Sequence, residues 1–288
     1  MPVIFRHPDL PDYFSKISSV RADSPLDSIP SITRYYELGS VVSFPRLKFD
    51  IDHDFWAALP TETYPRLKKL SSSPSAGDPG HDPLLDRRLG EAEVAEGIGR
   101  EIKREIVKIY AQVLPIYEAL FSGYNFLRRH VVWRLNTIRN ENLHIDTYHT
   151  DSEHHFARLF INLDNQPRIW MTSFGVEALF ERFANVVAPE VLAGGTSSEV
   201  RAALNEAAFG GRSSVWWDSQ PRHVAYFDPG DVWAVDSRQV SHQIFYGRRA
   251  VSIDYFVDRA SMTKPKRHYL AMAEALRTKV IAARQTNR

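Results

Sequence analysis

The chain has 288 residues, 43% of them hydrophobic, and its 36 Lys and Arg residues nearly balance 35 Asp and Glu residues. No basic run is interleaved with aromatic residues, so the footprint of nucleic-acid binding is missing and a small-molecule partner is favoured. Cysteine is absent, which excludes disulfides, thiolate metal sites and cysteine nucleophiles; any metal must be bound through nitrogen and oxygen. Prolines and charges near the start fit no secretory signal, and no apolar run reaches the length of a membrane span. We therefore expect a cytoplasmic protein without membrane association.

The first part of the chain, residues 1–125, is expected to be a mixed, largely helical support. Short apolar runs alternate with prolines up to residue 70, and the Ser-, Pro- and Gly-rich residues 71–83 predict a loop. Residues 89–121 then place apolar side chains at intervals of three and four, which predicts a long amphipathic helix with a break near Pro115.

The middle of the chain, residues 126–260, changes to a period of two. Short segments rich in β-branched and aromatic residues predict strands at 130–138, 156–164, 167–173, 222–228, 231–237 and 250–257. Their spacing is typical of a sandwich or jelly roll. Residues 174–208 predict a helical insertion between core strands, and residues 261–288 a C-terminal helix. The expected fold is one domain over residues 1–288, mainly β with flanking helices.

The strongest chemical pattern is a His-x-Asp pair followed by a distant histidine. His144 and Asp146 flank one residue, and positions i and i+2 of an extended chain point to the same face. His242 lies 98 residues downstream. Two histidines and one carboxylate form the facial triad of non-haem iron oxygenases, which leaves coordination positions open for co-substrate and dioxygen. A second copy, His149 and Asp151, has the same spacing; His144 is favoured because it follows a predicted strand after a short polar turn.

The region around His242 resembles the Fe(II)/2-oxoglutarate-dependent oxygenase superfamily. A tight turn at residues 228–231 leads to a strand predicted to end near His242, and a Gly-Arg-Arg sequence follows. The resemblance implies a jelly roll of the double-stranded β-helix type, with Fe(II), 2-oxoglutarate and O2 as cofactor and co-substrates; a use for ascorbate is left open. It also implies an arginine that binds the distal carboxylate of 2-oxoglutarate, first Arg249 and then its neighbour Arg248, since a planar guanidinium engages a carboxylate bidentately.

A closer resemblance, between Trp133 and His242, is to bacterial Kdo hydroxylases, which hydroxylate an octulosonic sugar acid. It rests on the segments LHIDTY, ARLFIN and PRIW. The arginine shared in these segments is Arg158, which makes it a competing anchor for 2-oxoglutarate or for a carboxylate of the substrate. The remaining candidates are polar or aromatic residues near the predicted ligand strands: Asn162 and Tyr148 for the co-substrate, and Arg134, Asn136 and Trp170 for the substrate.

The function expected from the triad and these resemblances is oxidation of an unactivated C–H bond in a small carboxylated substrate, such as a sugar acid, an amino acid or a natural-product intermediate. Hydroxylation is the default outcome, and cyclisation or desaturation stays open. Asp146 argues against an iron halogenase, which would lack that carboxylate. The alternatives are a zinc-dependent hydrolase using the histidines of residues 144–155, a cupin-like small-molecule binding protein, and a jelly roll without metal. Assembly as a homodimer is left open.

Overall fold

Two β-sheets form the centre of the protein, in a computed structural model that describes residues 2–75, 77–135, 142–147, 154–211 and 219–286. The smaller sheet has the strand order β1-β9-β8-β11 and the larger one β2-β3-β10-β7-β12-β6-β4, with β5 paired to β12. The strands are β1 (Val3–Phe5), β2 (Phe14–Lys16), β3 (Val41–Ser43), β4 (Lys69–Ser72), β5 (Phe126–Arg128), β6 (Val131–Arg134), β7 (His155–Asn162), β8 (Arg168–Gly175), β9 (His223–Phe227), β10 (Val232–Ala234), β11 (Val240–Tyr246) and β12 (Ala250–Val257).

The two sheets face one another across an aromatic layer. Phe160 of β7 meets Trp170 of β8 at a ring-centroid distance of 5.2 Å, and Phe227 of β9 stacks on Trp233 of β10 at 4.0 Å. These side chains belong to one buried cluster drawn from both sheets. Side chains of alternating residues on each strand therefore point into the space between the sheets, and the others point outward.

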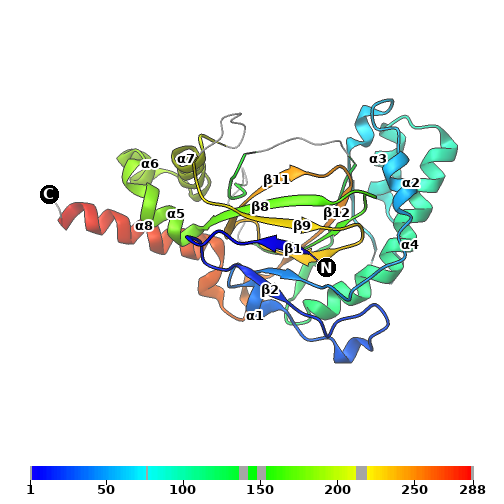
Figure 1. Cartoon of the computed structure of the whole chain (residues 1–288), viewed down its shortest axis with the longest axis horizontal. Helices are drawn as coiled ribbons and strands as arrows, with labels where there is room; N and C mark the ends of the chain where they lie inside the picture. The colour runs from blue at the N-terminus through cyan, green and yellow to red at the C-terminus, as the bar shows by residue number, and fades with distance from the viewer. Residues whose placement is uncertain (1, 76, 136–141, 148–153, 212–218, 287–288) are drawn as a thin grey trace.

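Helices gather in two groups on opposite sides of the sheets, with α2 to α4 in the first and α5 to α8 in the second (Figure 1). The first group, together with the short α1, packs its apolar side chains on the outer face of the larger sheet. The second group belongs to the segment between β8 and β9 and to the C-terminus. The α-helices are α1 (Thr33–Tyr36), α2 (His53–Ala58), α3 (Pro83–Glu91), α4 (Glu96–Leu120), α5 (Val176–Phe183), α6 (Pro189–Gly194), α7 (Ser197–Phe209) and α8 (Tyr269–Thr286).

Three sequence-based expectations about elements need correction. The helix predicted over residues 89–121 is two helices, α3 and α4, and α4 continues through Pro115. His242 lies inside a strand, β11, where the sequence predicted a strand that ends near it. The first 72 residues also contribute four strands, β1 to β4, to the sheets. None of the described helices has the length and apolarity needed to cross a membrane.

Candidate metal centre

The segment that carries His144 and Asp146 lies beside β11 at the edge of the smaller sheet. His144 and His242 exchange two backbone hydrogen bonds: the His144 amide donates to the His242 carbonyl at 3.1 Å, and the His242 amide donates to the His144 carbonyl at 2.9 Å. Residues that are directly opposite in an antiparallel pair present their side chains on the same face of the sheet. The backbone therefore brings the two imidazoles together although they are 98 residues apart in the sequence.

The same segment is held from its other edge by a helix of the insertion. Ile145, between the two candidate ligands, donates its amide to the Asn205 side-chain oxygen at 2.9 Å, and its carbonyl accepts from the Asn205 side-chain nitrogen at 2.9 Å. Leu143 and Ile145 pack into the apolar cluster of the α5–α7 helices. Because neighbours on an extended chain face opposite ways, this packing directs His144 and Asp146 away from the helices.

The three predicted metal ligands meet in one place. One ligand atom each from His144, Asp146 and His242 lies within 4.8 Å of the others. The Nε2 atom of His144 is 3.5 Å from Oδ1 of Asp146, and the two imidazole centroids are 4.5 Å apart. The Nδ1 atom of His144 lies 2.7 Å from the Asn142 carbonyl, to which it must donate; this fixes the tautomer that leaves a lone pair on Nε2. Two imidazoles and a carboxylate at these distances can hold a divalent metal ion.

The electrostatics of the triad favour the forms that bind metal. Burial lowers the pKa of His242 to about 3, aided by the nearby His144, so its imidazole is neutral near pH 7. Burial alone would raise the pKa of Asp146. The positive guanidinium of Arg158, which donates to Oδ2, and the two neighbouring imidazoles outweigh burial and hold that pKa well below its usual range. A neutral imidazole and an ionised carboxylate are the states that coordinate metals.

Two residues of β8 line the triad from within the smaller sheet. The indole of Trp170 stacks on the His242 imidazole, with 5.2 Å between centroids and 25° between planes. Thr172 is directly opposite His242 in the β8–β11 ladder. Its hydroxyl is buried and has no hydrogen-bond partner within the described ranges. Trp170, a sequence candidate for substrate contact, thus forms a wall behind a candidate ligand.

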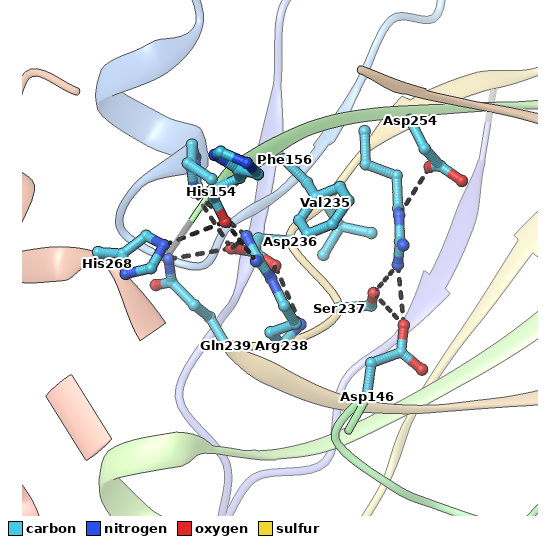
Figure 2. A network of polar contacts seen from close by, with 12 residues as sticks. Asp146, His154, Phe156, Val235, Asp236, Ser237, Arg238, Gln239, Asp254 and His268 are labelled. Carbon is cyan, nitrogen blue, oxygen red and sulfur yellow. Dashed lines mark hydrogen bonds and ion pairs between the residues drawn. The ribbon is translucent and has the colours of Figure 1, made fainter. Parts of the chain in front are cut away.

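Arg158 is the predicted arginine that contacts the triad. It projects from β7 into the space between the sheets and donates from Nη1 to Asp146 Oδ2 at 2.8 Å. Its Nε donates to Asp254 of β12 at 2.7 Å. Figure 2 shows Asp146, Ser237 and Asp254 around one guanidinium group, which these contacts identify as that of Arg158.

The structure does not bring Arg249 or Arg248 to the triad, which corrects the first choice of carboxylate anchor. Arg249 is on the same side of its strand as Val251 and Ile253, which pack in the cluster on the outer face of the larger sheet. Its guanidinium donates to the carbonyls of Trp56, Leu59 and Leu135. Arg248 instead donates to the buried carboxylate of Asp164 at 2.8 and 3.0 Å. Both side chains are therefore used for internal contacts.

Two further candidate residues, Asn162 and Arg134, lie on the larger sheet. Asn162 donates to the carbonyls of Gln166 and Phe227 and so secures the turn after β7. Arg134 is directly opposite Ala250, which is opposite Asn162, so all three share the inward face of the larger sheet. Its guanidinium makes no hydrogen bond or ion pair with any residue that the structure describes. Asn136, Tyr148 and the second His-x-Asp pair, His149 and Asp151, lie outside the described residues.

Comparison with solved structures finds a neighbour with the same fold. The chain shares the fold of the Kdo hydroxylase KdoO. It is 16% identical to that protein in complex with succinate and Fe(III) and in complex with alphaketoglutarate and Fe(III), with a TM-score of 0.67 for each; 91% of this chain and 95% of the other are covered. Its apo structure gives 17% identity and a TM-score of 0.63. KdoO is described as a non-heme Fe(II) alphaketoglutarate dependent dioxygenase. The distant resemblance predicted from the sequence is confirmed. No family model and no curated protein sequence matches the chain.

Three residues around the centre were missed by sequence reasoning. Ser237 donates its hydroxyl to Asp146 Oδ2 at 2.6 Å. Asp254 binds Arg158, and Asn205 binds the ligand segment. Asp254 carried a usable signal, because it is the single charged residue within the otherwise uncharged strand β12. Ser237 and Asn205 carried none, since a hydroxyl in a turn and an amide in a helix are common without any role of this kind.

Proposed function

We propose that this protein is a non-haem Fe(II)/2-oxoglutarate-dependent oxygenase that oxidises a C–H bond of a small carboxylated substrate, such as a sugar acid or an amino acid. The observation that carries the proposal is the meeting of His144, Asp146 and His242 on one inward face, within a fold shared with a dioxygenase of that type. Two histidines and a carboxylate on one side of a metal are the donor set of such oxygenases.

We also infer that the two sheets constitute a double-stranded β-helix. In chain order, β6, the 143–146 segment, β7, β8, β9, β10, β11 and β12 supply eight extended segments. Four of them form the order β6-β12-β7-β10 in the larger sheet, and the other four line up as 143–146, β11, β8 and β9. This alternation between two facing sheets supports the jelly-roll topology.

The residues of the chain have separable tasks in this proposal. His144, Asp146 and His242 would hold Fe(II), while the stacked Trp170 keeps the His242 imidazole in place and water away from it. When bound, Fe(II) supplies the site at which dioxygen is reduced at the expense of 2-oxoglutarate, which leaves as succinate and CO2. Hydroxylation is the simplest outcome, since it needs no second functional group on the substrate.

We assign to Arg134 the role of binding a carboxylate of 2-oxoglutarate or of the substrate. It points inward, and Lys69 of β4 is its direct partner in the β4–β6 ladder, so two cations share one face. An anion that binds beside Arg134 would be attracted by both cations. The assignment takes the place of Arg249, whose guanidinium is used by backbone carbonyls.

The test is anaerobic reconstitution with Fe(II), followed by titration with 2-oxoglutarate and measurement of the weak visible charge-transfer band of the chelate. We expect a band in the wild type and none in His144→Ala. Arg134→Gln should keep the band but need about 10–100 times more 2-oxoglutarate, because a charge-assisted hydrogen bond contributes roughly 1.5–3 kcal/mol. An unchanged titration in Arg134→Gln would mean that Arg134 binds a carboxylate of the primary substrate instead. Succinate release with candidate substrates then checks that assignment.

A folded, iron-loaded wild type without the band would overturn the oxygenase proposal. The second candidate is then a zinc-dependent hydrolase, because two imidazoles and a carboxylate also bind Zn²⁺ with a position left for water. Tight binding of zinc with hydrolysis of ester or amide substrates would support that candidate. The inward-facing Arg134 speaks for the oxygenase, since a hydrolytic zinc centre needs no anchor for an oxo acid.

A further inference from the structure

The two oxygens of Asp146 have different surroundings. Oδ1 faces His144, 3.5 Å from its Nε2 atom. Oδ2 accepts two hydrogen bonds on the opposite side, from Ser237 Oγ at 2.6 Å and from Arg158 Nη1 at 2.8 Å. A carboxylate held in this way presents a single oxygen to a metal, because its second oxygen is already engaged by a charged donor.

The guanidinium that holds Oδ2 is itself fixed. Arg158 and Asp254 are directly opposite in the β7–β12 ladder, and Nε donates to Asp254 Oδ1 at 2.7 Å. The Ser252 hydroxyl donates to the same Asp254 oxygen at 2.6 Å. Arg158 is 8% exposed and Asp254 4% exposed, so water screens these contacts little. One guanidinium therefore lies between the buried carboxylate of Asp254 and the partly exposed carboxylate of Asp146.

We propose that Arg158, together with Ser237, is a positioning residue that presents Asp146 to the metal through Oδ1 alone, and that Asp254 sets the orientation of Arg158. This inference rests on the proposed function, since it concerns the same metal centre. A carboxylate that binds through one oxygen leaves free the coordination position that its second oxygen would occupy. That position is needed when a chelating oxo acid and dioxygen share the remaining sites.

The same geometry separates this role from that of a co-substrate anchor. An anchor needs donors directed at an incoming carboxylate. Arg158 directs Nε at Asp254 and Nη1 at Asp146 and Ser237, so three of its five N–H groups serve these contacts within the chain. Its positive charge is also shared by two carboxylates of the chain, which weakens its attraction for a third. Arg158 thus acts on the metal through Asp146.

The first experiment measures Co(II) binding to the oxygen-free protein by visible absorption and by competition with a chromophoric chelator. We expect Arg158→Gln to bind Co(II) about 10–100 times more weakly than the wild type and with an altered spectrum, as residues that orient a ligand usually do. Ser237→Ala should show a weaker form of the same change. The matched control is Arg248→Gln, which removes an ion pair with buried Asp164 but touches none of the three ligands; its Co(II) affinity and spectrum should equal those of the wild type.

The second experiment asks whether the donors around Oδ2 recognise a carboxylate. Asp146→Gly should bind Co(II) weakly, and formate should restore binding, because formate can accept hydrogen bonds from Arg158 and Ser237 where the side chain was. Formate should have no such effect in the double variant Asp146→Gly with Arg158→Gln. Thermal unfolding of each variant shows that the comparison is made between folded proteins.

Each outcome bears on one claim. A wild type that binds neither Co(II) nor Fe(II) overturns the proposed function itself. A wild type that binds Co(II), with Arg158→Gln and Ser237→Ala both equal to it in affinity and spectrum, overturns the positioning role alone. Formate rescue that is absent, or equal in the single and double variants, also overturns it. Should Arg158→Gln fail to fold, Ser237→Ala and the formate effect in Asp146→Gly decide the question.

Discussion

Arg249 shows how a single residue can be assigned to the wrong side of a strand. Position 249 follows the alternation of Val251, Ile253 and Tyr255, which face outward and pack beneath the helices. The inward positions 250, 252 and 254 are Ala, Ser and Asp. Read with a period of two, the strand itself contained this information, but the resemblance to an arginine after the distal histidine outweighed it. An arginine does follow the distal histidine, but its side chain points to the outer face of the larger sheet and donates to backbone carbonyls there.

A substitution at Arg249 distinguishes a role in stability from a role in binding 2-oxoglutarate. Arg249→Gln should lower the free energy of unfolding by about 2–4 kcal/mol, because buried backbone carbonyls lose a charged donor. Chemical denaturation measures this loss. The 2-oxoglutarate concentration for half-maximal formation of the chelate band should stay as in the wild type. A large rise in that concentration with unchanged stability would restore Arg249 as the anchor.

At the scale of elements, the sequence predicted strands β6 to β10 and β12, and it missed β11 and the short strands β1 to β5. Strands of three or four residues, such as β1, β2 and β3, are too brief to show a period. They join the sheets through tertiary pairing, which no local pattern records. The sequence predicted the helical insertion, but the hydrogen bonds between Asn205 of α7 and the ligand segment depend on a contact 60 residues distant in the sequence.

Asn205 therefore gives a prediction at this scale. Asn205→Ala should weaken Co(II) binding about tenfold, because the Ile145 backbone between two ligands loses both of its side-chain partners. The control is Thr196→Ala, which removes the capping box of the same helix without touching the ligand segment. It should lower stability by about 0.5–2 kcal/mol and leave the affinity of the folded protein unchanged. Equal Co(II) affinities in Asn205→Ala and the wild type would contradict the expectation.

For the whole molecule, buried histidines should make stability depend on pH. Near the start of α8, the His154 carbonyl lies within hydrogen-bond distance of His268 and Arg238, and Arg238 pairs with Asp236 (Figure 2). The His155 imidazole contacts Arg238 and Asp236 as well. Burial lowers the pKa of His155 from 6.5 to about 3, against the opposing effect of Asp236. Burial, then Arg238, lowers the pKa of His268 to about 4. Both imidazoles are neutral in the folded protein, where their protonation is costly.

These lowered pKa values decide how stability changes with pH. Below about pH 6.5 the unfolded chain binds protons that the folded protein does not, so stability is complete above this pH and falls as the pH drops toward 4. At pH 5 each histidine should cost roughly 2 kcal/mol relative to pH 7. Urea unfolding of the metal-free protein at both pH values measures the loss, and His155→Gln should reduce it by roughly 2 kcal/mol. Equal losses in the variant and the wild type would show that His155 is protonated in the fold.

The overall architecture was predictable to the level of a β-rich core with flanking helices, and the sequence also predicted that His144, Asp146 and His242 lie close together. The pairing of His144 and Asp146 could be predicted because spacing on an extended chain decides which side chains share a face. The arginine nearest the triad could not be predicted in the same way. Arg134, Arg158 and Arg249 lie on or beside three different strands, and only the register of the assembled sheet shows which of them point inward.

The paired backbone of His144 and His242 has a consequence for how the protein handles its metal. Their mutual amide–carbonyl bonds involve no metal-binding atom, so the sheet itself sets the distance between the two imidazoles. We therefore expect the ligand pair to form by backbone pairing, unlike the sites of small domains that fold only around their ion. On this expectation, one divalent ion can be exchanged for another in the native protein. Supply and relative affinity, not the order in which the chain folds, would then decide which metal the centre holds.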